Sequence, residues 1–208
     1  IAAFLAGHRL DDFDAIVCEK LGHEKQQVSR CALAELNGRV FDALNTVILI
    51  RRAAAVGNPQ SPARMDIGLP EERFAHRKPK LGLITKSEIR ILSIAKMRLG
   101  PDAVVWDIGA GSGSVSIESA RIAVRGKVYA IEKNEEDIEN VRENIERFGT
   151  RNVTAVHGRA PDVFAGILDD PDAAFIGGSG GRMIDILEVV SRRLKSDGRI
   201  VLNLATIE

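Results

Sequence analysis

The segment VVWDIGAGSG, residues 104–113, is the part of this sequence that is most informative about its fold. A short apolar segment runs directly into a glycine-rich turn, and a helix is expected from residue 114 onward. A turn this tight favours residues without a Cβ, and a ligand can then approach the backbone closely. Because ligands bind at the carboxyl ends of the strands in an open α/β sheet, the turn is a candidate binding site.

The segments around this stretch alternate between strands and helices. Short apolar runs bounded by Gly, Asp or Pro predict strands at 103–107, 127–132, 153–157, 173–177 and 199–204. Amphipathic segments predict helices at 86–98, 114–124, 135–148 and 180–195. The helix at 135–148 is the best defined, because Asn134 can cap its start and Gly149 can end it. This alternation predicts an α/β fold with a mostly parallel sheet covered on both faces.

The first fifty residues have a different pattern. Segments 14–19 and 45–50 predict strands, and segment 28–36 between them predicts a short helix. Because about fifty residues are too few to form a good independent core, we expect residues 1–52 to be the C-terminal tail of a domain. The small residues, Gly and Pro of 53–68 predict a linker to the main domain, residues 69–208.

The two ends of the chain suggest a longer protein. The chain begins with Ile1 rather than Met and stops just after its fifth predicted strand. We therefore expect both ends to be cuts. We also expect the sheet to lack its last two strands, which leaves the last strand present with an unprotected side unless another chain covers it.

Composition limits the classes of function. The 208 residues include 29 basic and 29 acidic side chains, so there is no global basic field to hold nucleic acid. The two cysteines, Cys18 and Cys31, have no metal-ligand spacing and are too few for a disulfide framework. Apolar runs fall short of the ~18–20 residues of a membrane span. We expect a cytoplasmic protein without a metal site, a membrane or a nucleic-acid partner.

The spacing of the glycines distinguishes between cofactors. The dinucleotide fingerprint G-x-G-x-x-G would place its third glycine at Ser114, but that glycine comes one residue early. The pattern G-x-G-x-G, with Asp107 two residues before it, resembles S-adenosylmethionine (SAM)-dependent methyltransferases. The resemblance implies a Rossmann-like class I fold in which Asp107 and the turn bind SAM and release S-adenosylhomocysteine. The turn consists of Gly109, Ala110, Gly111, Ser112 and Gly113.

An acidic residue ends the second predicted strand of the main domain. Glu132 lies 23 residues after Gly109. A carboxylate at this position can accept hydrogen bonds from both hydroxyls of a ribose. The alternative is a solvated charge at the end of a strand, but the glycine turn at the matching spacing favours the ribose role.

Three further segments narrow the resemblance. They are GLITKSEIR at 82–90, HGRAPD at 157–162 and FIGGSGG at 175–181. Together with 107–113 they resemble the decarboxylating precorrin-6Y methyltransferases of cobalamin biosynthesis, from about residue 68 to residue 208. The resemblance implies methylation of carbon 15 of a precorrin or cobalt-precorrin, coupled to loss of carbon dioxide from the acetate on carbon 12. It also implies a tetrapyrrole substrate and a homotetramer.

The first fifty residues fit the same family. The segments CEKLG at 18–22 and TVILI at 46–50 resemble the end of a tetrapyrrole methylase. In the fused carbon 5/carbon 15 enzyme that domain precedes the decarboxylating one. Because only its tail is present, we do not expect carbon 5 methylation from this chain.

Two further cofactor contacts follow from the resemblance. It implies that Thr85 contacts SAM and that the backbone of Ala160 lines the adenine pocket. Residues 85–88 also form a potential capping box, with Thr85 and Glu88 at the start of the helix 86–98. Arg159 departs from the pattern, since related methyltransferases often have an acidic or small residue near the adenine.

The loop after the fourth predicted strand is the candidate substrate site. Methyltransferases that act on amines often have Asn/Asp-Pro-Pro-Tyr here, and this chain does not. In its place stand Gly177, Gly178, Ser179, Gly180, Gly181 and Arg182. Free backbone N–H groups at the start of helix 180–195 would suit an anion, so we expect a precorrin carboxylate near them or near Arg182. A turn needed only to reverse the chain is the alternative.

A basic stretch provides a second, weaker hypothesis for substrate binding. It consists of His76, Arg77, Lys78, Lys80, Lys86 and Arg90. These side chains could pair with substrate carboxylates, although a solvated face is the more common explanation.

Other functions remain open at this point. An RNA or protein methyltransferase should show a basic face or a target-binding motif. A non-catalytic SAM-fold module should show a degenerate turn or lack the ribose acid, and a nicotinamide-dependent dehydrogenase is disfavoured by the glycine spacing. The sequence indicates no catalytic acid or base, which fits a reaction that needs alignment and exclusion of water.

Overall fold

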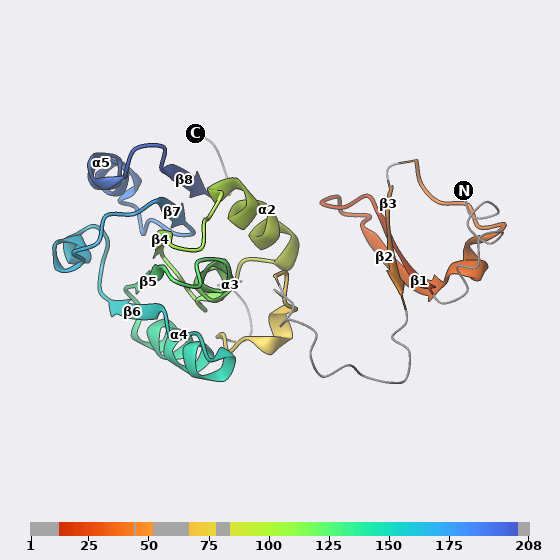
Figure 1. Ribbon diagram of the computed structural model, residues 1–208, viewed down its shortest axis with the longest axis horizontal. Coiled ribbons are helices and arrows are strands. Elements are labelled where there is room, and N and C mark those ends of the chain that lie inside the picture. Colours follow the sequence, from red (N-terminus) through yellow and green to blue (C-terminus); the bar gives the residue numbers. More distant parts are fainter. Residues whose placement is uncertain (1–12, 44, 52–66, 78–83, 204–208) are drawn as a thin grey trace. The chain divides into compact units, whose positions relative to one another are not determined.

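The computed structural model describes residues 13–43, 45–51, 67–77 and 84–203 (Figure 1). The chain forms two compact units, residues 1–62 and residues 63–208. The linker expected at 53–68 lies outside the described residues, except for Ile67 and Gly68. None of the described helices is long and apolar enough to span a membrane.

The first unit contains a small antiparallel sheet. Its strands are β1 (Phe13–Glu19), β2 (Gln27–Ala32) and β3 (Asn45–Arg51), in the order β2-β1-β3. The helix predicted at 28–36 is wrong, because most of this segment forms β2 and only Leu33–Leu36 form a short 3-10 helix, η1. β2 pairs with β1 from Asp14↔Ala32 to Glu19↔Gln27. Such pairing satisfies the backbone of both strands, which the local spacing of apolar residues cannot reveal.

The second unit is built on a five-stranded parallel sheet. The strands are β4 (Val104–Ile108), β5 (Lys127–Glu132), β6 (Val153–His157), β7 (Ala173–Ile176) and β8 (Arg199–Leu202). Their order is β6-β5-β4-β7-β8, and all four pairings are parallel. The chain thus runs outward from β4 in one direction and then crosses back to β7. A binding crevice is expected at this reversal, at the carboxyl ends of β4 and β7.

Helices cover both faces of the sheet, as predicted (Figure 1). One face carries α2 (Ser87–Met97), α3 (Ser114–Ile122) and α4 (Glu135–Phe148). The other carries α5 (Met183–Arg193) and the 3-10 helix η3 (Asp162–Gly166). The start predicted for the helix at 180 is wrong by three residues. Gly180 and Gly181 have φ values of 57° and 85°, which are left-handed and incompatible with the first turn of a helix.

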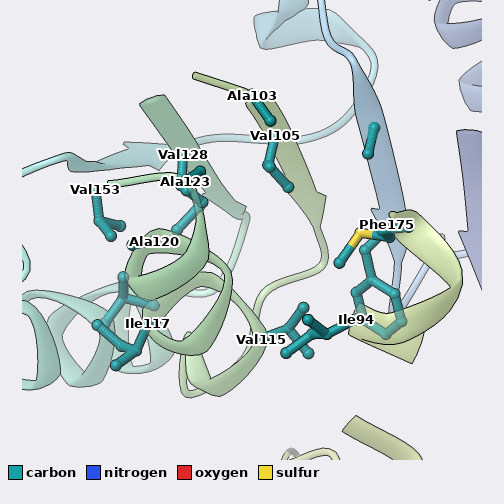
Figure 2. Packing of buried hydrophobic residues seen from close by; sticks show 14 of the residues in the cluster. Ile94, Ala103, Val105, Val115, Ile117, Ala120, Ala123, Val128, Val153 and Phe175 are labelled. Carbon is teal, nitrogen blue, oxygen red and sulfur yellow. The ribbon is translucent and has the colours of Figure 1, made fainter. Parts of the chain in front are cut away.

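Alternate residues of each strand point to opposite faces and form two separate cores. Val105 and Phe175 belong to the core beneath α2, α3 and α4. Figure 2 shows Ile94 of α2 and Val115 of α3 gathered around the ring of Phe175. Trp106 belongs to the other core, with side chains of α5 and η3. The continuous apolar strands of the sequence therefore reflect burial on both faces.

A buried ion pair links α2 to α3. Arg90 and Glu118 are fully buried, and Arg90 Nε donates to Glu118 Oε1 at 2.8 Å. The Glu118 carboxylate also accepts hydrogen bonds from the backbone N–H groups of Gly68 and Leu69, both at 2.8 Å. Arg90 donates in turn to the carbonyls of Leu69 and Thr85. Arg90 is therefore a structural residue, and the expectation that it pairs with a substrate carboxylate is wrong.

The Arg90→Met variant tests this pair. It leaves the Glu118 carboxylate buried without its cation, so we expect a loss of about 3–5 kcal/mol in the free energy of unfolding. Urea denaturation followed by Trp106 fluorescence measures it, because Trp106 is the single tryptophan and lies in the second unit. Arg142→Met is the control, because Arg142 pairs with Glu139 on the exposed surface of α4 and should matter little. Equal losses in both variants would contradict the structural role of Arg90.

Candidate functional site

A pocket of about 460 Å³ lies at the carboxyl ends of the strands of the second unit. Its volume is within the range of about 300–1,000 Å³ that is typical of small-molecule sites. The residues that line it include most of the site expected from the sequence: Thr85, Gly109, Ala110, Gly111, Glu132, Ala160, Gly177, Gly178, Ser179 and Gly180. The expected residues that do not line it are Asp107, Ser112, Gly113, Gly181 and Arg182.

The glycine turn is held between two neighbouring strands. The backbone N–H groups of Gly109 and Ala110 both donate to the carbonyl of Ile131 in β5, at 2.9 and 3.1 Å. Gly109 has a φ of 71°, and a Cβ on it would lie 2.4 Å from the carbonyl oxygen of Gly178. The turn after β4 and the loop after β7 therefore approach so closely that no side chain fits between them. Gly113, with a φ of 72°, is the N-cap of α3.

Glu132 fixes the turn from the end of β5. Its carboxylate is 8% exposed, and Oε2 accepts from the backbone N–H of Gly111 at 3.0 Å. Oε1 accepts from the N–H groups of Lys133 and Asn134, at 2.8 and 2.9 Å. A carboxylate has roughly four acceptor positions, so Oε2 can still accept a hydrogen bond from a ligand hydroxyl. The carboxylate is oriented in advance and points into the pocket.

Asp107 lies beneath the turn rather than in the wall of the pocket. Its Oδ2 accepts a hydrogen bond from the hydroxyl of Ser116, whereas Oδ1 has no partner among the described residues. Burial raises the pKa of the Asp107 carboxyl from 3.8 to about 7. The hydrogen bond from Ser116 opposes this shift, and the nearby charge of Glu132 adds to it. Oδ1 is thus a buried oxygen atom directly beneath the turn whose hydrogen-bonding capacity is unused by any described residue.

Thr85 lines the pocket, but its predicted capping role is wrong. The helix α2 begins at Ser87, and its N-cap, Lys86, makes no side-chain hydrogen bond. The Ser87 N–H donates instead to the carboxylate of Glu71, which lies in the short 3-10 helix η2 (Glu71–Arg73). A cap supplied from outside the helix leaves the Thr85 side chain available to the pocket. The Thr85 carbonyl is held by Arg90, at 2.5 Å from Nη1.

The loop after β7 forms another wall of the pocket. The N–H of Gly177 donates to the carbonyl of Ile108 at 2.9 Å, which anchors the loop to β4. Arg182 follows the loop, and its guanidinium pairs with Asp162 at 2.6 Å and with Asp185 at 2.9 Å. A substrate carboxylate at Arg182 would have to displace both partners. The predicted run of free N–H groups at a helix start is also wrong, since α5 begins only at Met183.

The basic stretch does not form one charged face in the described part of the chain. Arg77 lines the pocket, but its guanidinium donates to both oxygens of Asp137, at 2.8 and 2.7 Å. Lys78 and Lys80 lie outside the described residues. Lys86 alone remains as an exposed cation of this stretch in the pocket wall.

The sequence did not indicate several residues of the pocket, and two polar ones among them are Lys133 and Asn203. Lys133 follows Glu132 directly and Asn203 follows β8, and both line the pocket. Their positions just beyond the carboxyl ends of strands were the available signal, because such positions face the crevice of a parallel sheet.

The comparisons with known proteins agree on one family. A family model described as a precorrin methyltransferase domain matches residues 75–208. A Sulfolobus acidocaldarius protein named "Probable cobalt-precorrin-6B C(15)-methyltransferase (decarboxylating)" is 44% identical over 142 residues, which is 68% of this chain and 72% of that protein. A Sinorhizobium protein named "Precorrin-6Y C(5,15)-methyltransferase [decarboxylating]" is 34% identical over 192 residues, which is 92% of this chain and 44% of that protein.

A solved structure supports the same assignment. The crystal structure of a precorrin-6Y C5,15-methyltransferase from Geobacter metallireducens GS-15 superposes with a TM-score of 0.64 at 47% identity, covering 68% of this chain and 73% of that one. The Rossmann-like class I methyltransferase fold predicted from the sequence is confirmed, with its parallel sheet and covering helices.

The raised pKa of Asp107 predicts a pH-dependent stability. The unfolded carboxyl loses its proton near pH 4, whereas the native one holds it up to about pH 7, so the native state loses stability as the pH rises between these values. Asp107→Asn stays neutral and lacks this loss. Relative to the unchanged protein, we expect the variant to gain about 2–3 kcal/mol in unfolding free energy from pH 5 to pH 8.

Urea denaturation at both pH values, without any ligand, measures this gain. Asp102→Asn is the control, because the pKa of Asp102 is lowered by its hydrogen bond to Arg125 and the group does not titrate in this window. A gain for Asp107→Asn no larger than that of the control would show that Asp107 is ionised throughout.

Proposed function

The chain belongs to the precorrin methyltransferase domain family, and on this premise we propose that it methylates carbon 15 of a precorrin or cobalt-precorrin and removes carbon dioxide from the acetate on carbon 12. It is a decarboxylating C-methyltransferase of cobalamin biosynthesis. One observation carries the proposal: a single pocket is lined by the glycine turn, by Glu132 and by the loop after β7.

The described residues fit SAM as the methyl donor. The turn has no Cβ at Gly109 or Gly111, so a ligand can lie against its backbone. The Oε2 atom of Glu132 has room for a ribose hydroxyl, and Oδ1 of Asp107 lacks a donor. When bound, SAM supplies a methyl group made electrophilic by the sulfonium. We assign SAM binding to Thr85, Asp107, Gly109, Ala110, Gly111, Ser112, Gly113, Glu132 and Ala160.

The tetrapyrrole is assigned to the wall that the loop after β7 forms. The loop from Gly177 to Gly180 borders the same pocket and presents backbone and one small side chain, Ser179. A surface without bulky side chains suits a flat macrocycle. Because the loop touches the glycine turn at Gly109 and Gly178, a disc resting on it lies next to the cofactor site.

The contribution of the chain is alignment rather than acid–base chemistry. Neither histidine nor cysteine occurs among the described residues that line the pocket. The nucleophile is a carbon of the conjugated macrocycle, which is already electron-rich, and the electron pair of the broken carbon–carboxylate bond can pass into the same conjugated system. Holding donor and acceptor at the correct distance, with water excluded, can provide much of the rate enhancement of such a reaction.

The first unit and the assembly are assigned by the family resemblance. We propose that residues 1–52 are the tail of a tetrapyrrole-methylase-like domain, joined by a linker at 53–68 to the methyltransferase domain of residues 69–208. The alignment to the Sinorhizobium protein supports this, because it extends over 92% of the chain. A homotetramer in the cytoplasm, acting on no nucleic acid, is the assembly that we propose.

In the direct test, the chain is incubated with SAM and a precorrin-6Y-type substrate, and the mass of the product is measured by mass spectrometry. We expect the gain of one methyl group together with the loss of carbon dioxide. Gly109→Val should abolish both changes, because its side chain would meet the Gly178 carbonyl. Gly166→Ala is the control, since a Cβ there has no neighbour within 4 Å.

Three results would contradict the proposal or a part of it. A methyl gained without loss of carbon dioxide would exclude the decarboxylating activity. If the protein binds SAM but leaves the precorrin unchanged, its methyl acceptor is a different compound. Near-normal turnover by a folded Gly109→Val protein would remove the glycine turn from the active site.

A further inference from the structure

The charges around the pocket do not balance. Among the described lining residues, four are cations and two are carboxylates. Arg77 and Asp137 neutralise each other, which leaves three cations and the single carboxylate of Glu132, held by three backbone N–H groups. The remaining cations are Lys86, Lys133 and Arg159, which we call the cationic rim. No ion pair with another described residue is found for any of the three.

The cationic rim is assembled from three separate elements. Lys86 precedes α2, Lys133 follows β5, and Arg159 lies in the loop after β6. All three side chains are exposed, so each can meet a ligand at the pocket mouth. Lys133 reaches the loop after β7, since a Cβ built on Gly180 would lie only 2.9 Å from its Nζ. Its ammonium group therefore lies against the loop after β7, where the macrocycle is assigned.

Like charges held around one pocket repel one another, and an anionic ligand removes that repulsion. SAM is a poor candidate for this ligand, because its ammonium and sulfonium outnumber its single carboxylate. A macrocycle fringed with carboxylates is a better match in charge and in size. Arginine and lysine are also the side chains that form the stronger, charge-assisted hydrogen bonds to carboxylates.

We propose that the cationic rim, and Lys133 in particular, binds peripheral carboxylates of the tetrapyrrole and sets the selectivity of the pocket for a polycarboxylate macrocycle. The proposal rests on the proposed function and adds to it the residues that recognise the substrate. The cationic rim takes the role expected from the sequence for Arg77, Arg90 and Arg182 as binders of substrate carboxylates, because the charges of these three are already paired within the protein. Lys133 is a substrate-binding residue here and takes no part in bond breaking.

The test compares Lys127, the first residue of β5, with Lys133, the residue that follows its last one. Lys133→Gln removes the charge beside the pocket. Lys127→Gln removes a charge at the other end of β5, where Lys127 pairs with Asp169 outside the pocket, and serves as the matched control. Two ligands are titrated separately: SAM, and the octacarboxylate porphyrin uroporphyrin added to protein saturated with S-adenosylhomocysteine. The Michaelis constant for the precorrin substrate is measured in parallel.

We expect Lys133→Gln to weaken uroporphyrin binding and raise the Michaelis constant for the precorrin by about 5- to 20-fold, with SAM affinity unchanged. Arg159→Gln should act in the same direction, and the wild-type affinity for uroporphyrin should fall with added salt. Lys127→Gln should match the wild type throughout.

Either of two outcomes would overturn the inference. If the affinity for SAM falls and that for uroporphyrin does not, Lys133 binds the carboxylate of SAM. If Lys133→Gln behaves as Lys127→Gln does, the rim is only a solvated surface. A wild-type protein that binds uroporphyrin through Lys133 but leaves the precorrin unmethylated would refute the proposed function and not the rim.

Discussion

The carboxylate of Glu132 is the group on which the site depends. It accepts backbone hydrogen bonds from Gly111 in the glycine turn, from Lys133 and from Asn134. Asn134 in turn caps α4 by accepting from the N–H of Asp137. One side chain thus joins the end of β5, the turn after β4 and the start of α4. The same carboxylate faces the pocket, so the contacts that build the fold also orient the group proposed to bind the ribose.

A second carboxylate organises the other side of the pocket in a similar way. Glu118 in α3 holds the backbone of Gly68 and Leu69 and pairs with Arg90, which holds the carbonyl of Thr85. Gly68, Leu69 and Thr85 are therefore fixed to the core of the second unit, although none of them lies in a helix or strand. The position of Thr85 in the pocket is a consequence of this buried pair, and not of the capping motif in which it occurs.

The sequence predicted the parts of the molecule whose signals are local. The strand and turn at 104–113, the acid at Glu132 and the helix from Asn134 to Gly149 each combine neighbouring residues, and the structure places them as expected. The predictions that failed concern elements and side chains whose partners lie far along the chain. β2 is a strand because it pairs with β1, Arg90 is buried because Glu118 lies opposite it, and α2 is capped by Glu71. No local pattern contains that information.

The most direct test is a crystal structure of the chain with S-adenosylhomocysteine. The geometry of the pocket predicts the adenosine between the glycine turn and Ala160, with a ribose hydroxyl within about 3 Å of Glu132 Oε2. It also predicts an unchanged Glu132 side chain, because three backbone N–H groups already hold it in place. A ribose bound elsewhere, or a Glu132 that swings out of the pocket on binding, would contradict it.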